Sequence, residues 1–261
     1  MKPIVVKIGG STLGREDTTL EDLVTLQHRG VPLVVVHGGG RLISHWQSKL
    51  RIAASFVRGE RVTDAQSLEV VVAVLAGLVN KELVARVNGL GGRAMGLSGA
   101  DCGIIEARVK NPELGRVGEV VGINTAPLEI LLEAGYIPFL APVGLQYGGR
   151  RGPEAPLLNI NSDIVAGEVA RALGAERLIF LTDVAGVLDS QGGLIPHLSP
   201  GQARDLIDSG TAVAGMIPKL EASLRAVERV EVACIIDGRV PRALLQELEG
   251  EMAGTTIRGD R

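Results

Sequence analysis

Short apolar stretches rich in Val and Ile alternate along the chain with longer stretches in which apolar residues recur at helical spacing. The short stretches cover residues 3–8, 33–36, 94–97, 137–140 and 177–181. Continuous apolar runs of this length are typical of parallel strands that are buried on both faces, and helical spacing is typical of the helices that cover them. The pattern therefore predicts an α/β fold.

The first two runs enclose a predicted helix, and both end in glycines. Thr18 and Glu21 have capping-box spacing, and the apolar face that follows them stops at Gly30. A strand, a helix and a strand joined by short connections form a βαβ unit, whose two strands lie parallel. Glycines 9–10 and 38–40 should therefore lie on the same edge of the sheet, where open α/β sheets bind ligands.

The three glycines at residues 38–40 would weaken a strand or a helix, so their use is conformational. They let backbone N–H groups crowd around a small anion. The helix expected over residues 41–50 adds its free N-terminal donors and positive dipole end at the same place. A glycine-rich turn without a ligand is the alternative for this run taken alone. A lysine at the end of the first strand, Lys7, favours the anion site.

A hairpin and a long helix follow. Residues 55–63 predict a hairpin that turns near Gly59 and carries Arg61 on its returning arm. A guanidinium there could fork onto a carboxylate, and a lone surface arginine is the alternative. The helix expected from residue 64 to 88 is apolar around more of its circumference than one sheet face needs, which indicates a subunit interface. The patterns of residues 104–109 and 116–121 predict antiparallel strands that interrupt the α/β alternation.

Two polar positions in the second half do not fit a purely structural role. Helix capping and the helix dipole explain Asn161, Ser162 and Asp163, but Asn159 falls inside the apolar end of a strand. We therefore interpret Asn159 as a ligand contact. Lys219 lies in the first turn of a later helix, where the dipole favours acids, so we expect it to pair with an anion.

The composition excludes several classes of function. The 261 residues include 27 Lys and Arg against 30 Asp and Glu. The sequence has no stripe of basic residues of the kind that binds a nucleic-acid backbone, so nucleic acid is not expected as a partner. Cys102 and Cys234 are too few and too isolated for a disulfide framework or a metal cluster, which suits a reducing cytoplasm. Because no signal-peptide pattern and no apolar stretch of about 18 residues occurs, we expect a cytoplasmic protein with neither nucleic acid nor membrane as a partner.

Glycine loops, helix N-termini and two lysines together indicate phosphoryl transfer, in which catalysis consists largely of neutralising charge on the transferred group. The absence of any Gly-Lys dipeptide excludes a Walker P-loop, and no metal-ligand or nucleophile-base spacing stands out. His37 could serve as a general base, but a histidine that closes a buried strand is more often a packing or hydrogen-bonding residue.

Six motifs together resemble the amino-acid kinase family, in order and over nearly the whole chain. They are Lys7-Ile8-Gly9-Gly10-Ser11, His37-Gly38-Gly39-Gly40, Gly59-Glu60-Arg61-Val62-Thr63-Asp64, Leu158-Asn159-Ile160-Asn161-Ser162-Asp163, Leu181-Thr182-Asp183-Val184-Ala185-Gly186-Val187 and Gly215-Met216-Ile217-Pro218-Lys219. The resemblance implies a carbamate kinase-like fold, a three-layer αβα sandwich around a mainly parallel sheet, as a single domain over residues 1–261. It further implies that an N-terminal lobe of about residues 1–150 binds an acyl amino acid and that a C-terminal lobe of about residues 157–261 binds ATP.

The same resemblance implies a role for each motif. Lys7 and Lys219 would stabilise the phosphoryl group in transit, and Asp163 would hold both lysines in position. The residues implied for the acyl amino acid are Gly38, Gly39, Arg61 and Asn159. Those implied for the nucleotide are Gly9, Gly10, Thr182, Asp183, Gly186 and Met216. ATP would carry Mg²⁺ mainly through its phosphates, so no metal site made by the protein is expected.

Within the family, the chain is most similar to the branch that phosphorylates the γ-carboxylate of N-acetyl-L-glutamate, the second step of arginine biosynthesis, and a homodimer is implied. One alternative is a kinase of aminoadipate or glutamate held on a carrier protein. An acidic carrier would need a rim of basic residues, and the only candidates in the sequence are Arg150 and Arg151. Another is a non-catalytic ligand sensor, which would have no use for both lysines and Asp163. Two residues depart from the family pattern: Glu60 replaces a commonly apolar residue and Arg41 a frequent proline.

Overall fold

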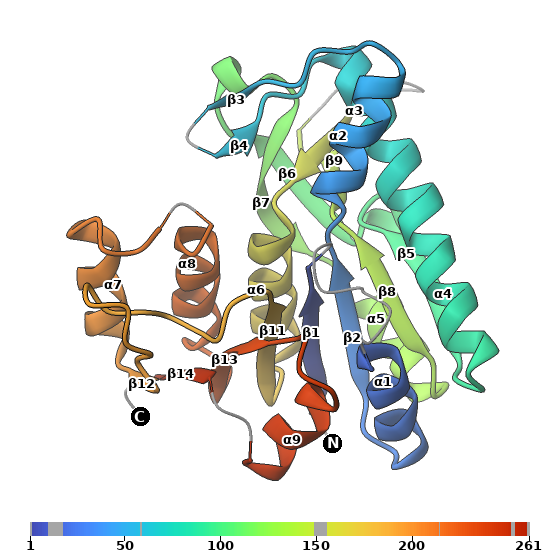
Figure 1. Ribbon diagram of the computed structural model, residues 1–261. Coiled ribbons are helices and arrows are strands. Elements are labelled where there is room, and N and C mark those ends of the chain that lie inside the picture. The colour runs from blue at the N-terminus through green and yellow to red at the C-terminus, as the bar shows by residue number, and fades with distance from the viewer. Residues whose placement is uncertain are drawn as a thin grey trace.

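The computed structural model describes residues 2–9, 18–57, 59–148, 156–213, 215–251 and 254–259, and every structural statement below concerns these residues. Figure 1 shows a sheet flanked by helices, with a smaller β-structure above one of its edges. Within the described ranges, no helix is long and apolar enough to span a membrane.

The main sheet has β1 (Ile4–Ile8) near its centre. Among the described residues its order is β12 (His197–Leu198), β14 (Gly254–Arg258), β13 (Val232–Asp237), β11 (Arg177–Thr182), β1, β2 (Leu33–His37), β8 (Ile137–Ala141) and β5 (Ala94–Ser98). Every neighbouring pair is parallel except β13 and β14. The predicted mainly parallel sheet is confirmed.

One long helical stretch and several shorter helices connect the strands. The long stretch joins α3 (Ala65–Val72), a π-helical segment η1 (Ala73–Val79) and α4 (Asn80–Gly89), and it matches the helix expected from residue 64 to 88. The others are α1 (Thr19–His28), α2 (Gly40–Lys49), α5 (Ala126–Glu133), α6 (Ser162–Leu173), α7 (Pro200–Asp208), α8 (Ile217–Ala226), α9 (Ala243–Glu249) and the short 3₁₀ turns η2 (Asp101–Gly103) and η3 (Pro112–Leu114). The sequence pattern did not predict α9.

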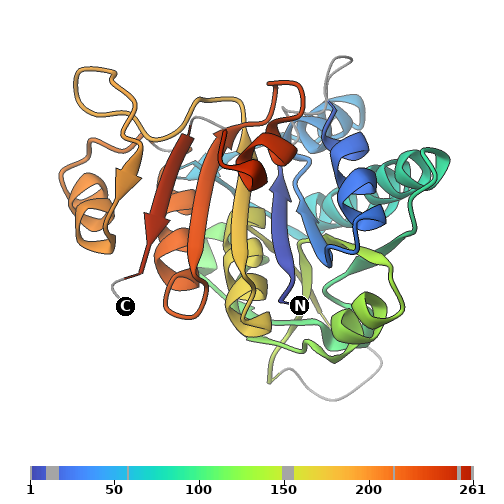
Figure 2. The same cartoon turned by 90° about the horizontal axis from the view of Figure 1, so that it is seen from below.

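Alternate residues of the central strands face opposite helical layers. Val5 and Leu178 belong to a core that includes residues of α6 and α8. Val6 and Ile179 belong to a second core that includes residues of α1, α4 and α9. Burial on both faces explains why these strands have no polar alternation. Figure 2 shows helices on both sides of the sheet, and the three-layer αβα sandwich is confirmed.

The smaller β-structure contributes one wall of the candidate site. In it, β6 (Ile105–Val109), β7 (Val117–Ile123), β9 (Val143–Gln146) and β10 (Leu157–Ile160) close into a barrel, while β3 (Phe56–Val57) and β4 (Glu60–Arg61) form the expected hairpin. The antiparallel pairing of β6 with β7 confirms the predicted antiparallel strands. The strand β9 was not predicted, and Arg150 and Arg151 lie outside the described residues.

Candidate active site

The carboxyl ends of β1 and β2 lie side by side, as a βαβ unit requires. The backbone N–H of Gly38 donates to the Ile8 carbonyl at 3.0 Å, and that of Gly9 donates to the Leu181 carbonyl at the end of β11 at 3.4 Å. The prediction that the glycine runs share one edge of the sheet is therefore confirmed for Gly9 and for glycines 38–40. Gly10 lies outside the described residues.

Two lysines and one carboxylate form an ionic cluster at this edge. Lys7 Nζ lies 2.8 Å from Asp163 Oδ1, and Lys219 Nζ lies 3.1 Å from Asp163 Oδ2. Lys7 points toward α6 because it shares the face of β1 that carries Val5. The side chain of Asn161 accepts from the backbone N–H of Asp163 at 2.8 Å, which fixes Asp163 at the start of α6. The structure thus brings the three predicted catalytic residues together.

Charge balance in this cluster favours ionised side chains. Burial of the Asp163 carboxyl opposes its ionisation, but the ammonium groups of Lys7 and Lys219 outweigh burial and hold the pKa of Asp163 below its ordinary value. Lys219 also donates to the Gly215 carbonyl at 3.0 Å. Two cations around one anion leave one net positive charge, so the cluster can still attract an anionic group.

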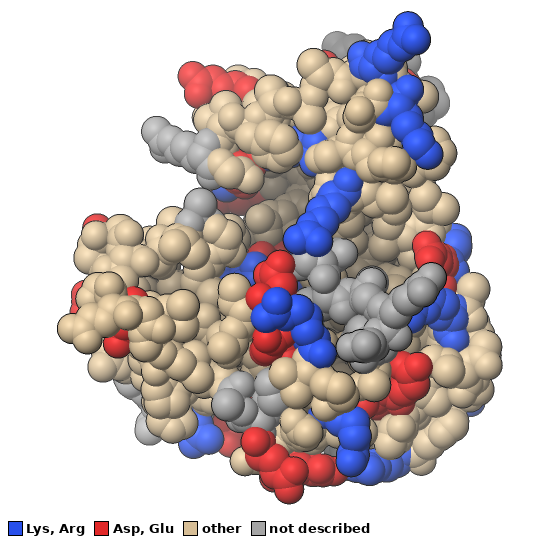
Figure 3. All heavy atoms as spheres, in the orientation of Figure 1, with Lys and Arg blue, Asp and Glu red and all other residues tan. Residues whose placement is uncertain are grey.

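A cavity of about 210 Å³ opens next to the cluster. Its lining residues come from the glycine run and α2, the hairpin, η1, the barrel with its connections and the start of α6. They are Gly38, Gly39, Gly40, Ile43, Phe56, Gly59, Glu60, Arg61, Leu75, Val117, Pro142, Asn159, Ile160, Asn161 and Ser162. All four residues predicted to bind the acyl amino acid are among them. Figure 3 shows the surface hollowed between the part of the molecule that carries the hairpin and the part that carries α7 and α8.

Arg61 is held at this cavity by uncharged acceptors. Its guanidinium donates to Gln47 Oε1, to Ser44 Oγ at 2.7 Å and to the Gly40 carbonyl at 3.1 Å, and its Cζ lies 4.8 Å from the centre of the Phe56 ring. Within the described ranges, no carboxylate lies within ion-pair distance of Arg61. The side chain is therefore oriented by α2 while its positive charge stays available for a ligand.

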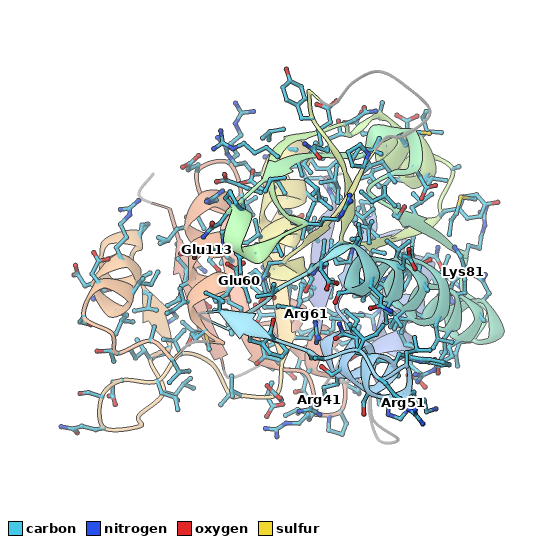
Figure 4. The ribbon with its side chains drawn as sticks, turned by 90° about the horizontal axis from the view of Figure 1, so that it is seen from above. Arg41, Arg51, Glu60, Arg61, Lys81 and Glu113 are labelled. Atoms are coloured by element: carbon cyan, nitrogen blue, oxygen red, sulfur yellow. The ribbon has the colours of Figure 1, made fainter. Side chains whose placement is uncertain are left out.

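Glu60, the acidic neighbour of Arg61, has a partner of its own. Lys110 Nζ lies 2.8 and 3.0 Å from the two carboxylate oxygens of Glu60. In Figure 4 Arg61 lies toward the middle of the molecule, and Glu60 lies toward Glu113. Glu60 therefore does not compete for Arg61, and this departure from the family pattern leaves the arginine free to meet a carboxylate.

Three of the residues predicted for the nucleotide, Thr182, Asp183 and Gly186, lie at the end of β11 and in the turn that follows it. Thr182 Oγ1 accepts from the Val184 backbone N–H at 3.1 Å and contacts the Val184 carbonyl at 2.8 Å, so it shapes the turn. A side chain at Gly186 would meet Thr255 Oγ1 at 2.7 Å, so the turn needs glycine there. Asp183 is exposed and lies 3.8 Å from Arg41 at the start of α2, whereas the Met216 side chain is buried in the core.

The structure supports the packing interpretation of His37. Burial, opposed only in part by the hydrogen bond to the Gly38 carbonyl, lowers the pKa of His37 to about 4. Nε2 lies 3.0 Å from Asn80 Nδ2, and Nδ1 lies 3.1 Å from the Gly38 carbonyl. With both nitrogens occupied, His37 has no position open for a substrate proton.

Sequence reasoning missed the supporting residues of the site. Gln47 and Ser44 hold Arg61, Lys110 holds Glu60, and Thr63 Oγ1 accepts from the Asn159 side-chain amide at 3.1 Å. Each pair joins residues from different segments of the chain, so no local sequence spacing predicts the contact. A polar residue on the buried side of an amphipathic helix, as Gln47 is on α2, was the one available signal.

The fold and the ionic cluster define a phosphotransferase, built to hold anions between glycine-rich strand ends and two lysines. The sequence matches the amino acid kinase family over residues 2–237, and the chain belongs to that family. An acetylglutamate kinase from Dehalococcoides mccartyi strain BAV1 is 46% identical over 256 residues, which are 98% of this chain and 94% of the relative.

Solved structures agree with this assignment. The crystal structure of smu.665 from Streptococcus mutans UA159 shares 32% sequence identity, covers 98% of both chains and superposes with a TM-score of 0.84. Carbamate kinase from Giardia lamblia, at 13% identity and 99% coverage of both chains, superposes with a TM-score of 0.72 and shows the common fold alone.

Proposed function

We propose that the protein phosphorylates the γ-carboxylate of N-acetyl-L-glutamate with ATP, the second step of arginine biosynthesis. The observation that carries this proposal is the cavity itself, which is lined by Arg61, an arginine without an ion-pair partner among the described residues, and by Ser162, the neighbour of Asp163 in the two-lysine cluster. Arg61 provides a fork for a carboxylate. Phe56, Ile43 and Leu75 offer apolar surface for an acyl group. The 46% identity to an acetylglutamate kinase supports the same substrate.

In the proposed reaction, an oxygen of the γ-carboxylate attacks the terminal phosphorus of ATP. The bond between that phosphorus and the bridging oxygen breaks, and ADP leaves with the electron pair, so the products are an acyl phosphate and ADP. Lys7 and Lys219 meet the negative charge that spreads over the transferred group, and Asp163 keeps the two ammonium groups in place before ATP arrives. No protein nucleophile is needed.

Mg²⁺ accompanies ATP in this proposal and is held through the phosphates. Both oxygens of Asp163 already face ammonium groups. The described part of the chain contains no group of three or more His, Cys, Asp or Glu that could hold a metal ion. The metal would neutralise charge on the phosphates and orient them. We place the enzyme in the cytoplasm, where ATP is available.

The decisive experiment measures ADP release with N-acetylglutamate, glutamate, aspartate and UMP side by side, with hydroxylamine trapping of any acyl phosphate. We expect hydroxamate only with N-acetylglutamate. Activity on UMP alone, without hydroxamate, would refute the proposal. Turnover of an aminoadipate or glutamate carried on a protein, with none of free N-acetylglutamate, would favour the carrier-linked alternative.

We also propose a homodimer that pairs through an apolar patch on α2, α3 and η1. Its residues, lined up along one surface groove, are Trp46, Leu50, Val70, Ala73, Val74 and Leu78. Leu50 and Leu78 are 55% and 43% exposed, which is unusual for large apolar side chains that line the same groove. Among the described residues that line this groove, Glu69 is the single acid. A second copy of the same patch would cover it without burying many charges.

Light scattering tests the homodimer, since a mass near 27.3 kDa contradicts it. Leu78→Glu should give a folded monomer, because Leu78 is exposed on the patch. Leu75→Glu is the matched control from the same helix: Leu75 is 3% exposed, so a buried unpaired carboxylate should prevent folding. A Leu78→Glu protein that stays dimeric moves the interface elsewhere.

A further inference from the structure

Asn80 is a buried polar residue at the point where the π-helical segment η1 gives way to α4. Its side chain is fully shielded from solvent. Its Nδ2 atom lies 2.9 Å from the Phe139 carbonyl of β8, 3.3 Å from the Leu97 carbonyl of β5 and 3.0 Å from Nε2 of His37 at the end of β2. These three strands are neighbours in the sheet. One amide thus contacts residues of three neighbouring strands, including the last residue of β2 at the edge that carries the site.

The neighbours of Asn80 determine which way its amide faces. Lys81 Nζ lies 3.0 Å from Asn80 Oδ1 and 3.0 Å from the Gly96 carbonyl. A lysine ammonium has donors only, so the atom that faces it is the amide oxygen. The NH₂ group then faces two carbonyls and the His37 ring. Lys81 lies on α4, on the side of the molecule opposite the hairpin in Figure 4.

The orientation of this amide decides where His37 carries its proton. Because Asn80 donates, Nε2 of His37 accepts, and the neutral ring holds its proton on Nδ1. Nδ1 then donates to the Gly38 carbonyl at 3.1 Å. The Gly38 backbone N–H donates in turn to the Ile8 carbonyl at 3.0 Å. Both backbone polar groups of Gly38 are therefore held: the carbonyl through His37 and Asn80, and the N–H through β1.

The π-helical segment braces the same glycines from the side. A side chain at Gly39 would lie 2.6 Å from Leu75 Cδ2 and 3.3 Å from Val79 Cγ2, so η1 packs directly against the backbone of Gly39. Short π-helical stretches occur often at functional sites because they shift the side chains that follow them. Here the π-helical segment ends at Val79, and Asn80 follows it with its side chain against His37 at the end of β2.

We propose that Asn80 is a positioning residue for the acyl-amino-acid site: it holds His37 in the Nδ1–H form, and His37 holds the Gly38 carbonyl and with it the start of α2. The inference rests on the proposed function in that Gly38 and Gly39 line the substrate cavity. Asn80 touches neither the cavity nor the lysine cluster. Its loss should therefore weaken binding of the acyl amino acid more than it affects ATP or the chemical step.

Asn80→Leu tests the proposal, because leucine is close to asparagine in size and cannot donate. We expect the KM for N-acetylglutamate to rise about tenfold, the effect of one lost buried hydrogen bond, with the KM for ATP and kcat within about twofold. Asn88→Leu is the matched control on the same helix. Asn88 bonds the backbone of Ala94 at 2.7 and 3.3 Å at the opposite end of β5, so its loss should leave both KM values unchanged.

Nitrogen NMR of the imidazole rings provides a readout that a general loss of packing would not give. His37 is one of four histidines and is buried, whereas His28, His45 and His197 are exposed. In the wild type we expect a neutral His37 ring with its proton on Nδ1 from pH 6 to 8. In Asn80→Leu we expect a mixture of the two neutral forms, together with shifted amide signals of residues 38–40.

A wild-type His37 with its proton on Nε2 overturns the proposal, and this measurement needs no variant that folds. An Asn80→Leu enzyme with unchanged KM for N-acetylglutamate overturns it as well, as does a loss confined to kcat. The proposed function fails separately: if the wild type forms no acyl phosphate from N-acetylglutamate, the substrate is wrong, while the ring proton and the amide signals of residues 38–40 still decide the role of Asn80.

Discussion

Replacing Asp163 by asparagine should uncouple the stability of the ligand-free protein from its ability to bind nucleotide. The substitution keeps the size and shape of the side chain but removes the one negative charge between Lys7 and Lys219. Both contacts are buried, with the Asp163 side chain 9% exposed and the two lysine side chains 8% and 17% exposed. Two cations and one anion give the cluster a net charge of +1, and the variant has +2.

The magnitude follows from the distances. At contacts of 2.8 and 3.1 Å, each pair attracts by about 5–6 kcal/mol at an effective dielectric constant of 20, before the cost of desolvation. Removing one partner of a buried ion pair costs about 3–5 kcal/mol in measured cases, because the other charge stays buried. Without ligand, we therefore expect the free energy of unfolding of Asp163→Asn to be about 3–5 kcal/mol lower than that of the wild type. The phosphates of ADP can replace the lost carboxylate, so ADP should stabilise the variant more than the wild type.

Urea unfolding with and without ADP measures both effects, and hydroxylamine trapping measures turnover, which should fall at least about 100-fold because the lysines lose their fixed positions. Glu168→Gln is the matched control, since Glu168 also lies between two cations, Arg171 at 3.5 Å and Arg225 at 3.1 Å, but away from the site. The control should turn over normally. A ligand-free Asp163→Asn protein as stable as the wild type would refute the reasoning.

The ion pairs of Asp163 with Lys7 and Lys219 also make the stability of the wild type depend on pH in the acid range. The ordinary pKa of an aspartate is 3.8, and the two ammonium groups hold the folded value lower despite burial. A depressed folded pKa means that the unfolded chain binds the proton more readily, so folding is favoured while the carboxyl is ionised. The contribution of Asp163 to stability is complete above the ordinary pKa and disappears as the pH falls through the lower folded pKa. Asp163→Asn should remove this part of the acid transition.

Three further variants address separate parts of the site. Lys219→Ala should lower kcat by about 100-fold or more with little change in the KM for N-acetylglutamate, because a cation that meets charge developed in transfer acts on the transition state; a raised KM with normal kcat contradicts this. Arg61→Lys should weaken N-acetylglutamate binding in calorimetry and leave ATP binding unchanged, since an ammonium cannot form a bidentate fork; equal loss for both ligands would move Arg61 out of the substrate site. Lys110→Met should raise the KM for N-acetylglutamate, because the Glu60 carboxylate next to Arg61 then lacks its cation. Adding Glu60→Gln to the same chain should restore the KM, and no recovery would assign Lys110 another role.

The parts of the fold that the sequence predicted are those fixed by burial. Strands such as β1 and β11 lie between two helical layers, so nearly all of their residues are apolar, and Lys7 in β1 and the end residues Arg177 and Thr182 of β11 are the exceptions. Such an apolar run can be recognised in the sequence without knowing the partner strands. The prediction failed where pairing decides the structure. The four-residue strand β9 exists because it pairs with both β10 and β6, and α9 is seven residues long and follows Arg242 in a left-handed conformation. Neither carries a long enough periodic signal.

The candidate site divides in the same way. Glycine runs after buried strands and a lysine at a helix start are local conflicts with ordinary propensity, and such conflicts mark function. The residues that orient the site belong to ordinary segments: Gln47 and Asn80 are helix residues, and Lys110 follows the last residue of β6. Their importance comes from contacts across the fold, with sequence separations of 14 residues for Gln47, 43 for Asn80 and 50 for Lys110. Apart from the polar Gln47 on the buried side of α2, local spacing does not reveal them.

The topology explains why a charged side chain is tolerated in a fully buried central strand. From β1 the chain passes to β2 on one side, whereas β11 joins β1 on the other side after α6, so the connections diverge at the carboxyl end of β1. Such a point leaves a crevice in an open α/β sheet. Lys7 lies one residue before the end of β1, where its ammonium meets the start of α6 and Asp163. Its position is therefore set by a central strand and a capped helix, and a charge held so rigidly needs little reorganisation when the transferred phosphoryl group arrives.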